Sequence, residues 1–382
     1  MRIAQVSPLI ESVPPSQYGG TERVVAFLTD ELVAARHEVT LFASGDSRTR
    51  ARLVPCATRA LRLDPRCVDP LAHQIRMVEE VARRAAEFDL VHFHIDYVHF
   101  SVMRSLGVPH VTTLHGRLDV PDLAPLYRTF ADEPVVSISD AQREPLPFAA
   151  WAGTVYHGLP LDLLSFHAAR GRYLAFLGRI SPEKGVDRAV EIAKRTGMPL
   201  KIAAKVDKID AGYFETHVKP LLAHPLVEFV GEIGEAEKDR FLGEAAVVLF
   251  PVDWPEPFGL VMIEAMACGT PVVAFARGSV PEVMRDGVSG FIVEDLEQAV
   301  RAVPRALALS RAACRAYFED RFQVARMAED YVRIYERILA GSRADDEVTR
   351  RRVVSPSPSA VSTSSGRRRE WQGRGNRETT RS

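Results

Sequence analysis

Short apolar segments recur along the chain and alternate with longer segments whose apolar residues lie three and four positions apart. The short segments predict buried β-strands, and the longer ones predict amphipathic helices. This alternation is typical of an α/β fold with parallel sheets. The predicted strands are residues 3–6, 38–42, 90–96, 109–114, 135–138, 173–178, 200–204, 227–230, 247–250, 271–275 and 290–293, and the predicted helices are 21–35, 70–87, 186–195, 211–223, 235–245, 295–309 and 324–340.

The apolar pattern lapses at residues 160–172 and resumes with the strand at 173–178. A chain of 382 residues has room for two domains that each bury a core. We therefore predict one α/β domain over residues 1–165, a second over 166–323, and a closing helix at 324–340.

The composition changes at Gly341 to Ser, Pro, Thr and Arg, with few large apolar residues. Such a segment cannot bury enough surface to offset the entropy of ordering, so we predict a disordered tail over 341–382. Its arginine runs at 350–352 and 367–369 leave a contact with nucleic acid or anionic lipid open, but a dispensable tail is the favoured interpretation.

Composition narrows the class of protein. Apolar residues make up 46% and charged residues 26% of the chain, and the formal net charge is -1, so nothing favours binding to nucleic acid over the whole chain.

The N-terminal apolar segment is too short for a signal peptide, and no run reaches the roughly 18 residues of a membrane span, so we expect a cytoplasmic protein. Four scattered cysteines without a CxxC spacing predict neither a zinc site nor a disulfide framework.

The stretch from Pro251 to Pro271 is the most informative. A strand ends at residue 250, prolines stiffen the loop that carries Glu256, and a short apolar helix starts at Gly259. The unpaired amides and partial positive charge of that helix start suit a phosphate. Glu264 follows about 7 Å further along the helix axis. The two carboxylates therefore flank a predicted anion site.

A nucleotide-sugar matches this arrangement, because its diphosphate separates a sugar from a ribose and carboxylates accept hydrogen bonds from the hydroxyls of both. Two other interpretations stay open at this point. Glu256 and Glu264 fit ordinary surface positions when each is taken alone, and a carboxylate pair also fits a glycoside hydrolase. A hydrolase, however, has no use for an anion-binding helix start between its two carboxylates.

Several ordered motifs resemble family 4 of the retaining glycosyltransferases with the GT-B fold. The E-x7-E signature of that family is matched by Glu256 and Glu264, which are separated by seven residues. The sequence Glu-Pro-Phe-Gly-Leu is the form in which the family usually begins this signature. The resemblance covers about residues 1–340 and extends through segments 18–22, 113–116 and 178–185. It implies two facing Rossmann-like domains with parallel sheets and an interdomain cleft. The first domain would bind the acceptor and the second the nucleotide-sugar, with the last helix returning to the first domain.

The resemblance also implies retention of the anomeric configuration, no bound metal or other cofactor, and an acceptor that is a small molecule, a saccharide or a lipid, with peripheral membrane contact left open. The residues it implies for catalysis are His115, Arg179, Lys184 and Glu256. Those it implies for binding the donor are Gly19, Gly20, Arg179, Lys184, Glu256, Phe258, Gly259, Leu260 and Glu264, with Lys205 as an additional contact and residues 230–233 at the nucleobase. The usual Asn-Gly-Val-Asp of the family is replaced here by a segment that starts at His157.

Purely structural explanations stay open for several of these residues. Arg179 and Lys184 fit a solvated basic loop, and the glycines at 19 and 20 fit a simple turn. His92 and His94 share one strand face and, with neighbouring polar groups, allow a metal site, although histidines at strand ends are more often hydrogen-bonded structural groups. A nucleotide-sugar 2-epimerase and a non-catalytic nucleotide-sugar binding protein remain as other functions.

Overall fold

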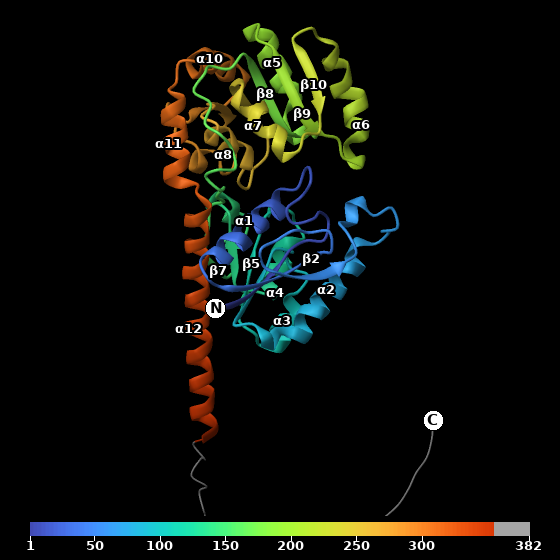
Figure 1. Cartoon of the computed structure of the whole chain (residues 1–382), viewed down its shortest axis with the longest axis vertical. Helices are drawn as coiled ribbons and strands as arrows, with labels where there is room; N and C mark the ends of the chain where they lie inside the picture. The colour runs from blue at the N-terminus through green and yellow to red at the C-terminus, as the bar shows by residue number, and fades with distance from the viewer. Residues whose placement is uncertain (355–382) are drawn as a thin grey trace, which may run out of the picture. The chain divides into compact units, whose positions relative to one another are not determined.

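The computed structural model describes residues 1–354, with side chains to residue 342. Residues 1–340 form one compact unit that contains two parallel sheets. The first sheet has the strand order β3-β2-β1-β4-β5-β6-β7, and Figure 1 shows its elements in blue to teal. Its strands are β1 (Arg2–Val6), β2 (Glu38–Ser44), β3 (Arg52–Ala57), β4 (Leu90–Phe93), β5 (His110–Thr113), β6 (Val135–Ser137) and β7 (Trp151–Thr154).

Helices cover both faces of the first sheet because alternate strand residues point to opposite sides. In β1, Ile3 belongs to the apolar cluster that contains Val24 of α1, whereas Ala4 belongs to the cluster that contains Val78 of α2. The helices are α1 (Gly20–Ala34), α2 (Pro70–Arg84), α3 (Phe100–Leu106) and α4 (Leu123–Thr129), with 3₁₀ turns η1 (Leu61–Leu63), η2 (Ala85–Glu87) and η3 (Ala141–Arg143).

The second sheet repeats this design with the order β10-β9-β8-β11-β12-β13, again with parallel pairing throughout. Its strands are β8 (Tyr173–Arg179), β9 (Leu200–Lys205), β10 (Val227–Gly231), β11 (Ala245–Phe250), β12 (Val272–Phe275) and β13 (Gly290–Val293). Its helices are α5 (Val186–Thr196), α6 (Ala211–Tyr213), α7 (Glu235–Gly243), α8 (Leu260–Ala267), α9 (Val280–Val283), α10 (Leu296–Ala306) and α11 (Arg311–Arg321). Short turns of 3₁₀ or π type complete it: η4 (Pro182–Lys184), η5 (Lys208–Asp210), η6 (Phe214–Val218) and η7 (Lys219–Ala223).

The predicted α/β architecture of two parallel-sheet lobes is confirmed. The sheet changes between Thr154, where β7 ends, and Tyr173, where β8 begins, and the predicted domain boundary at residues 165/166 lies within this connection. In each sheet the strand order reverses beside the first strand, between β1 and β4 and between β8 and β11. Ligands of open α/β sheets bind outside the carboxyl ends of the strands at such points. The loops after these four strands are therefore the expected position of a ligand-binding site.

The last helix, α12 (Val324–Val354), packs on the first lobe. Its residues Tyr331 and Tyr335 are fully buried in the cluster that contains Ile3 and Val24, and Arg337 Nη2 donates to the carbonyl of Ala152 at 2.9 Å. The helix continues through residues 341–354, past the residue at which we predicted the tail to begin. These residues include good helix formers such as alanine, arginine and glutamate. The rest of the predicted tail, 355–382, lies outside the described residues.

None of the helices in residues 1–354 is long and apolar enough to cross a membrane.

Candidate active site

A cavity of about 460 Å³ opens at the carboxyl ends of both sheets, where residues of the two lobes face each other. It is lined by the loop between β1 and α1, by the ends of β8 and β9, and by the loop between β11 and α8. All the residues predicted for catalysis or donor binding line it: Gly19, Gly20, His115, Arg179, Lys184, Glu256, Phe258, Gly259, Leu260 and Glu264. The structure thus brings together groups that are far apart in the sequence.

The loop that carries Glu256 is fixed by the segment after β12. The backbone amide of Ser279 donates to the carbonyl of Glu256 at 2.9 Å, and the Ser279 hydroxyl donates to the carbonyl of Phe258 at 3.0 Å. Gly278 lies so close that a Cβ there would be 2.4 Å from the backbone nitrogen and oxygen of Glu256. The backbone on both sides of Glu256 is therefore held by contacts as well as by prolines.

Two donors hold the carboxylate of Glu256. Lys184 Nζ lies 2.5 Å from Oε2, and the indole Nε1 of Trp254 donates to the same oxygen at 2.8 Å. The Lys184 ammonium also lies 4.9 Å from the centre of the Trp254 ring. No described residue donates a hydrogen bond to Oε1 of Glu256, so this oxygen is available to a ligand.

The second acidic residue, Glu264, is almost completely buried on α8, with 1% of its surface exposed. Lys238 Nζ lies 2.6 Å from its Oε1, and Arg23 Nη1 lies 4.0 Å from the same oxygen. Burial alone would raise the pKa of Glu264, but the charges of Lys238 and Arg23 hold this pKa below its ordinary value. The carboxylate is therefore ionised at neutral pH.

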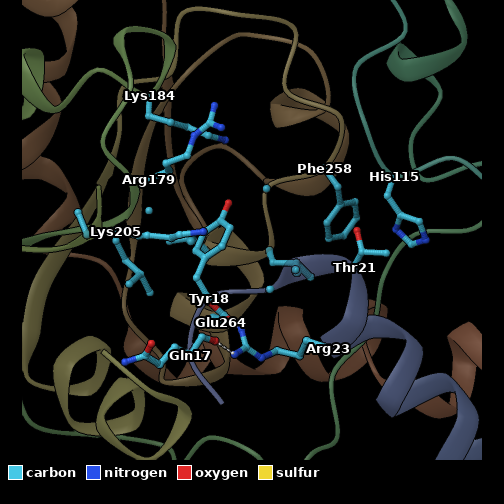
Figure 2. Close-up of a pocket in the computed structure, with 18 of the residues that line it drawn as sticks. Gln17, Tyr18, Thr21, Arg23, His115, Arg179, Lys184, Lys205, Phe258 and Glu264 are labelled. Carbon is cyan, nitrogen blue, oxygen red and sulfur yellow. Dashed lines mark hydrogen bonds and ion pairs between the residues drawn. The ribbon is translucent and has the colours of Figure 1, made fainter. Parts of the chain in front are cut away.

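Arg23 and Lys238 line the cavity beside Glu264, and the sequence prediction missed both. Arg23 belongs to α1 of the first lobe, and its Nε lies 2.6 Å from Glu235 of the second lobe, so it joins the two lobes beside Glu264 (Figure 2). Arg23 lies three positions after Gly20, on the same helix face, and this spacing was a usable signal. Lys238 lies in a polar helix with no local pattern that points to a site.

The positive groups of the cavity are paired with acids. Arg179 Nη2 donates to Glu183 at 2.6 Å, and other nitrogens of its guanidinium lie 3.9 Å from Asp207 and 3.7 Å from Asp210. Lys205 Nζ lies 2.8 Å from Asp207. Figure 2 shows Arg179 and Lys184 next to each other, on the other side of the cavity from His115. An anion that enters between them would replace carboxylate partners.

The starts of two helices, α1 and α8, lie next to each other in the cavity wall. Gly259, which precedes α8, has a φ of 77°, and a Cβ there would lie 2.8 Å from Met262 Cε and from Phe250 Cζ. Only glycine fits this position without strain. A Cβ on Gly20, at the start of α1, would lie 3.5 Å from Leu260 Cδ1. Both helix starts therefore offer unpaired amides to the wall of the same cavity.

His115 contributes a neutral imidazole to the cavity wall. Its Nε2 lies 2.9 Å from Nδ1 of His94, and its ring stacks on His157 with centroids 5.4 Å apart. Burial lowers the pKa of His115 from 6.5 to about 3, so the ring carries no charge at neutral pH. His157 in turn packs edge-on against Phe258, with centroids 4.7 Å apart. The family-atypical His157 thus supports the ring of His115.

The alternative of a metal site at the strand ends receives no support from the geometry. His92 and His94 use their ring nitrogens in hydrogen bonds to Thr113, Tyr335, Gln5 and His115. Within the part of the chain that the structure describes, no three His, Cys, Asp or Glu residues are placed to hold a metal ion. The histidines therefore belong to a hydrogen-bonded network.

Comparison with known families decides the class of protein. Residues 18–174 match the family model described as Glycosyltransferase Family 4, and residues 166–320 match the model described as Glycosyl transferases group 1. The chain is a family 4 glycosyltransferase of the GT-B fold. The predicted family is thereby confirmed, and each of the two models falls on one lobe of this glycosyltransferase.

Known proteins similar to this glycosyltransferase agree with the assignment. A D-inositol 3-phosphate glycosyltransferase of Mycobacterium leprae (strain Br4923) is 35% identical over 180 residues, which are 41% of this chain and 38% of that protein. The match thus spans less than half the length of that relative. Sucrose-phosphate synthase from Thermosynechococcus elongatus has the same fold, with a TM-score of 0.73 and 20% identity over 89% of this chain and 99% of that one. Anabaena HepE, solved in complex with UDP and glucose, has a TM-score of 0.68 at 19% identity, over 87% and 98% of the two chains.

Proposed function

We propose that this glycosyltransferase moves a sugar from a nucleotide-diphosphate donor to a hydroxyl group of an acceptor, with retention of the anomeric configuration and without a metal ion. The observation that carries the proposal is the pair of acids on one loop and helix. Glu256 keeps one oxygen open to the cavity, and Glu264 is held ionised. The start of α8 lies between them in the sequence.

Our proposal gives the donor one orientation in the cavity. The ribose diol would donate to Glu264, the sugar hydroxyls would donate to Glu256, and the diphosphate would lie against the start of α8 beside Arg179 and Lys184. The complex of HepE with UDP and glucose supports a donor of this class, because that protein shares the fold. The name of the mycobacterial relative likewise supports a polyhydroxylated acceptor.

The reaction that we propose breaks the bond between the anomeric carbon and the phosphate oxygen and forms a bond from that carbon to the acceptor oxygen. Both events occur on one face of the sugar, and the proton of the acceptor hydroxyl passes to the departing phosphate. Negative charge therefore grows on the diphosphate, next to Lys184 and Arg179. Cations placed where charge develops stabilise the transition state most, so these side chains would do what a divalent ion does in other transferases.

Thermal-shift screening of UDP-, GDP- and ADP-sugars tests the donor class, because a ligand that binds only the folded protein raises its melting temperature. The matching donor should then be consumed in the presence of polyol, saccharide and lipid acceptor pools, in buffer that contains EDTA. NMR of the product should show the anomeric configuration of the donor. An inverted product would refute retention, and loss of turnover in EDTA would refute metal independence. Epimerisation of the donor alone would replace transfer with the 2-epimerase function.

A further inference from the structure

A chain of buried polar side chains leads away from the cavity behind His115. His115 Nε2 lies 2.9 Å from His94 Nδ1, and His94 Nε2 lies 2.8 Å from Oε1 of Gln5. Gln5 is fully buried on β1, and only 3% of the surface of His94 is exposed. The wall of the cavity is therefore linked to the interior of the first lobe by hydrogen bonds.

The chain continues from Gln5 to the last helix. Gln5 Nε2 donates to the hydroxyl of Tyr335 at 3.2 Å, and that hydroxyl lies 2.7 Å from Nδ1 of His92. His92 Nε2 lies 2.7 Å from the hydroxyl of Thr113, which donates to the hydroxyl of Tyr331 at 3.0 Å. Tyr331 and Tyr335 both belong to α12. Polar groups of three neighbouring strands and of α12 thus form one network.

The proton positions of this network follow from the amide of Gln5. Its Nε2 is a donor toward Tyr335, so the oxygen that faces His94 is an acceptor. His94 must then carry its single ring proton on Nε2, because burial lowers its pKa far below 6.5 and keeps the ring neutral. Its Nδ1 is therefore an acceptor, so the proton of His115 lies on Nε2. The remaining nitrogen of His115, Nδ1, carries a lone pair.

We propose that His94, Gln5 and Tyr335 are positioning residues that hold His115 as a hydrogen-bond acceptor toward a hydroxyl of the transferred sugar. No group of the described residues is hydrogen-bonded to His115 Nδ1, and His115 is only partly buried where it lines the cavity. Stacking on His157 fixes the ring plane. Figure 2 shows His115 close to Phe258 and Thr21. The inference rests on the proposed function for the identity of the ligand.

A second buried histidine of the first lobe, at the start of α3, provides a matched control. His99 Nε2 lies 2.8 Å from the hydroxyl of Thr112, and its ring stacks on Phe93 with centroids 3.6 Å apart. Like His94, His99 is buried and does not line the cavity, but His99 makes no hydrogen bond to His115. Replacement of His99 therefore reports what the loss of a buried histidine does to the fold alone.

The proton assignment can be tested without turnover. In protein labelled with ¹⁵N-histidine, two-bond proton–nitrogen NMR spectra distinguish a protonated ring nitrogen from one with a lone pair. We expect an Nε2-protonated, neutral His115 in the full chain, and a loss of this single tautomer in Tyr335→Phe. A proton on Nδ1 of His115 would mean that the network runs in the opposite direction, and would overturn the proposal whether or not the protein transfers sugar.

Donor kinetics test the positioning role. His94→Leu should lower kcat/KM for the donor by at least tenfold, whereas His94→Asn should stay within about threefold of the wild type, because its amide oxygen replaces Nδ1 as the acceptor. His99→Leu should lower the melting temperature without a change in donor KM. Among donor analogues that each lack one sugar hydroxyl, one should be used equally well by wild type and His94→Leu. Equal donor kinetics for His94→Leu and His99→Leu would refute the positioning role. So would the finding that wild type and His94→Leu differ in kcat/KM on every one of the donor analogues.

Discussion

Lys184 Nζ lies 2.5 Å from Oε2 of Glu256, although 72 positions separate the two residues in the sequence. The lysine ends the turn after β8, and the glutamate lies in the loop after β11, so the pair spans the point where the order of the second sheet reverses. Without a ligand, the ammonium and the carboxylate are paired with each other. In the proposed donor complex the ammonium of Lys184 would pair with the diphosphate, and the carboxylate of Glu256 would accept hydrogen bonds from sugar hydroxyls.

Lys184→Ala should lower kcat by two or more orders of magnitude and leave the fold intact. Removal of one group that stabilises transition-state charge typically has an effect of about 10²–10³. Single-turnover kinetics with saturating donor measure the change. Lys201→Ala is the matched control, because Lys201 pairs with Glu228 on neighbouring strands away from the cavity. An unchanged kcat in Lys184→Ala would remove this residue from the mechanism.

Lys238→Met should destabilise the protein by about 3–5 kcal/mol, because it leaves the Glu264 carboxylate buried beside only the more distant Arg23. The donor KM should rise as well, since the carboxylate then protonates more readily. Urea unfolding at pH 7 measures the stability. Lys219→Met, which removes a solvent-exposed pair with Glu215, should change it by less than about 1 kcal/mol.

The lowered pKa of Glu264 also predicts the direction of a pH effect. A carboxyl group whose pKa is lower in the folded state stabilises the fold above its ordinary value of 4.5, and this stabilisation is lost as the pH falls through the folded-state pKa. In Lys238→Met that acid-side loss should shift to higher pH. Urea midpoints measured between pH 3 and pH 7 would show the shift, and superimposable wild-type and variant profiles would contradict it.

Glu22 predicts a pH effect of the opposite sign. It is 6% exposed in the cavity wall, and burial raises its pKa from 4.5 to about 7. The folded state therefore holds a proton that the unfolded state has lost, so the free energy of unfolding should fall as the pH rises from about 4.5 to 7. Glu22→Gln should remove up to about 3 kcal/mol of this dependence. Glu31→Gln, on the same helix outside the cavity, should keep the wild-type slope of the urea midpoint against pH.

Gly278→Ala should destabilise the protein and weaken donor binding together. Its φ of 56° strains any other residue, and the added Cβ would collide with the backbone of Glu256 at 2.4 Å. Gly287→Ala separates the two causes, because Gly287 has a φ of 73° with no atom within 4 Å of the new Cβ. The control should therefore lose only the roughly 1–2 kcal/mol that the left-handed backbone conformation costs a residue with a Cβ. Calorimetric melting and donor titration measure both effects, and equal losses in the two variants would show that the contact with Glu256 does not matter.

The two-lobe fold and part of the cavity lining were predictable because their signals are local. Gly259, Glu256 and Lys184 all lie where a strand passes into a helix, and there the residue types themselves indicate the turn and the charge. Edge strand β3 was missed because Pro55 interrupts it. Helix α11 was missed because it buries only Cys314 and Phe318, so its sequence has too few apolar residues to show a helical period.

The partners of the site residues were not predictable in the same way. Lys238 reaches Glu264 from another helix, and Gln5 connects histidines of a strand that follows 85 or more positions later. Such pairings depend on the register between strands and on the packing of the lobes, which no single segment encodes. The acids around Arg179 were missed for the same reason, since Asp207 and Asp210 follow a different strand.

The return of α12 to the first lobe has a consequence for synthesis on the ribosome. Tyr331, Tyr335 and other residues of α12 complete a core whose remaining buried members all come from the first half of the chain. The residues of α12 are translated only after the entire second lobe. The nascent first lobe must therefore wait, with one apolar face uncovered, for the last helix to emerge, and chaperones that shield such a face would act during that interval.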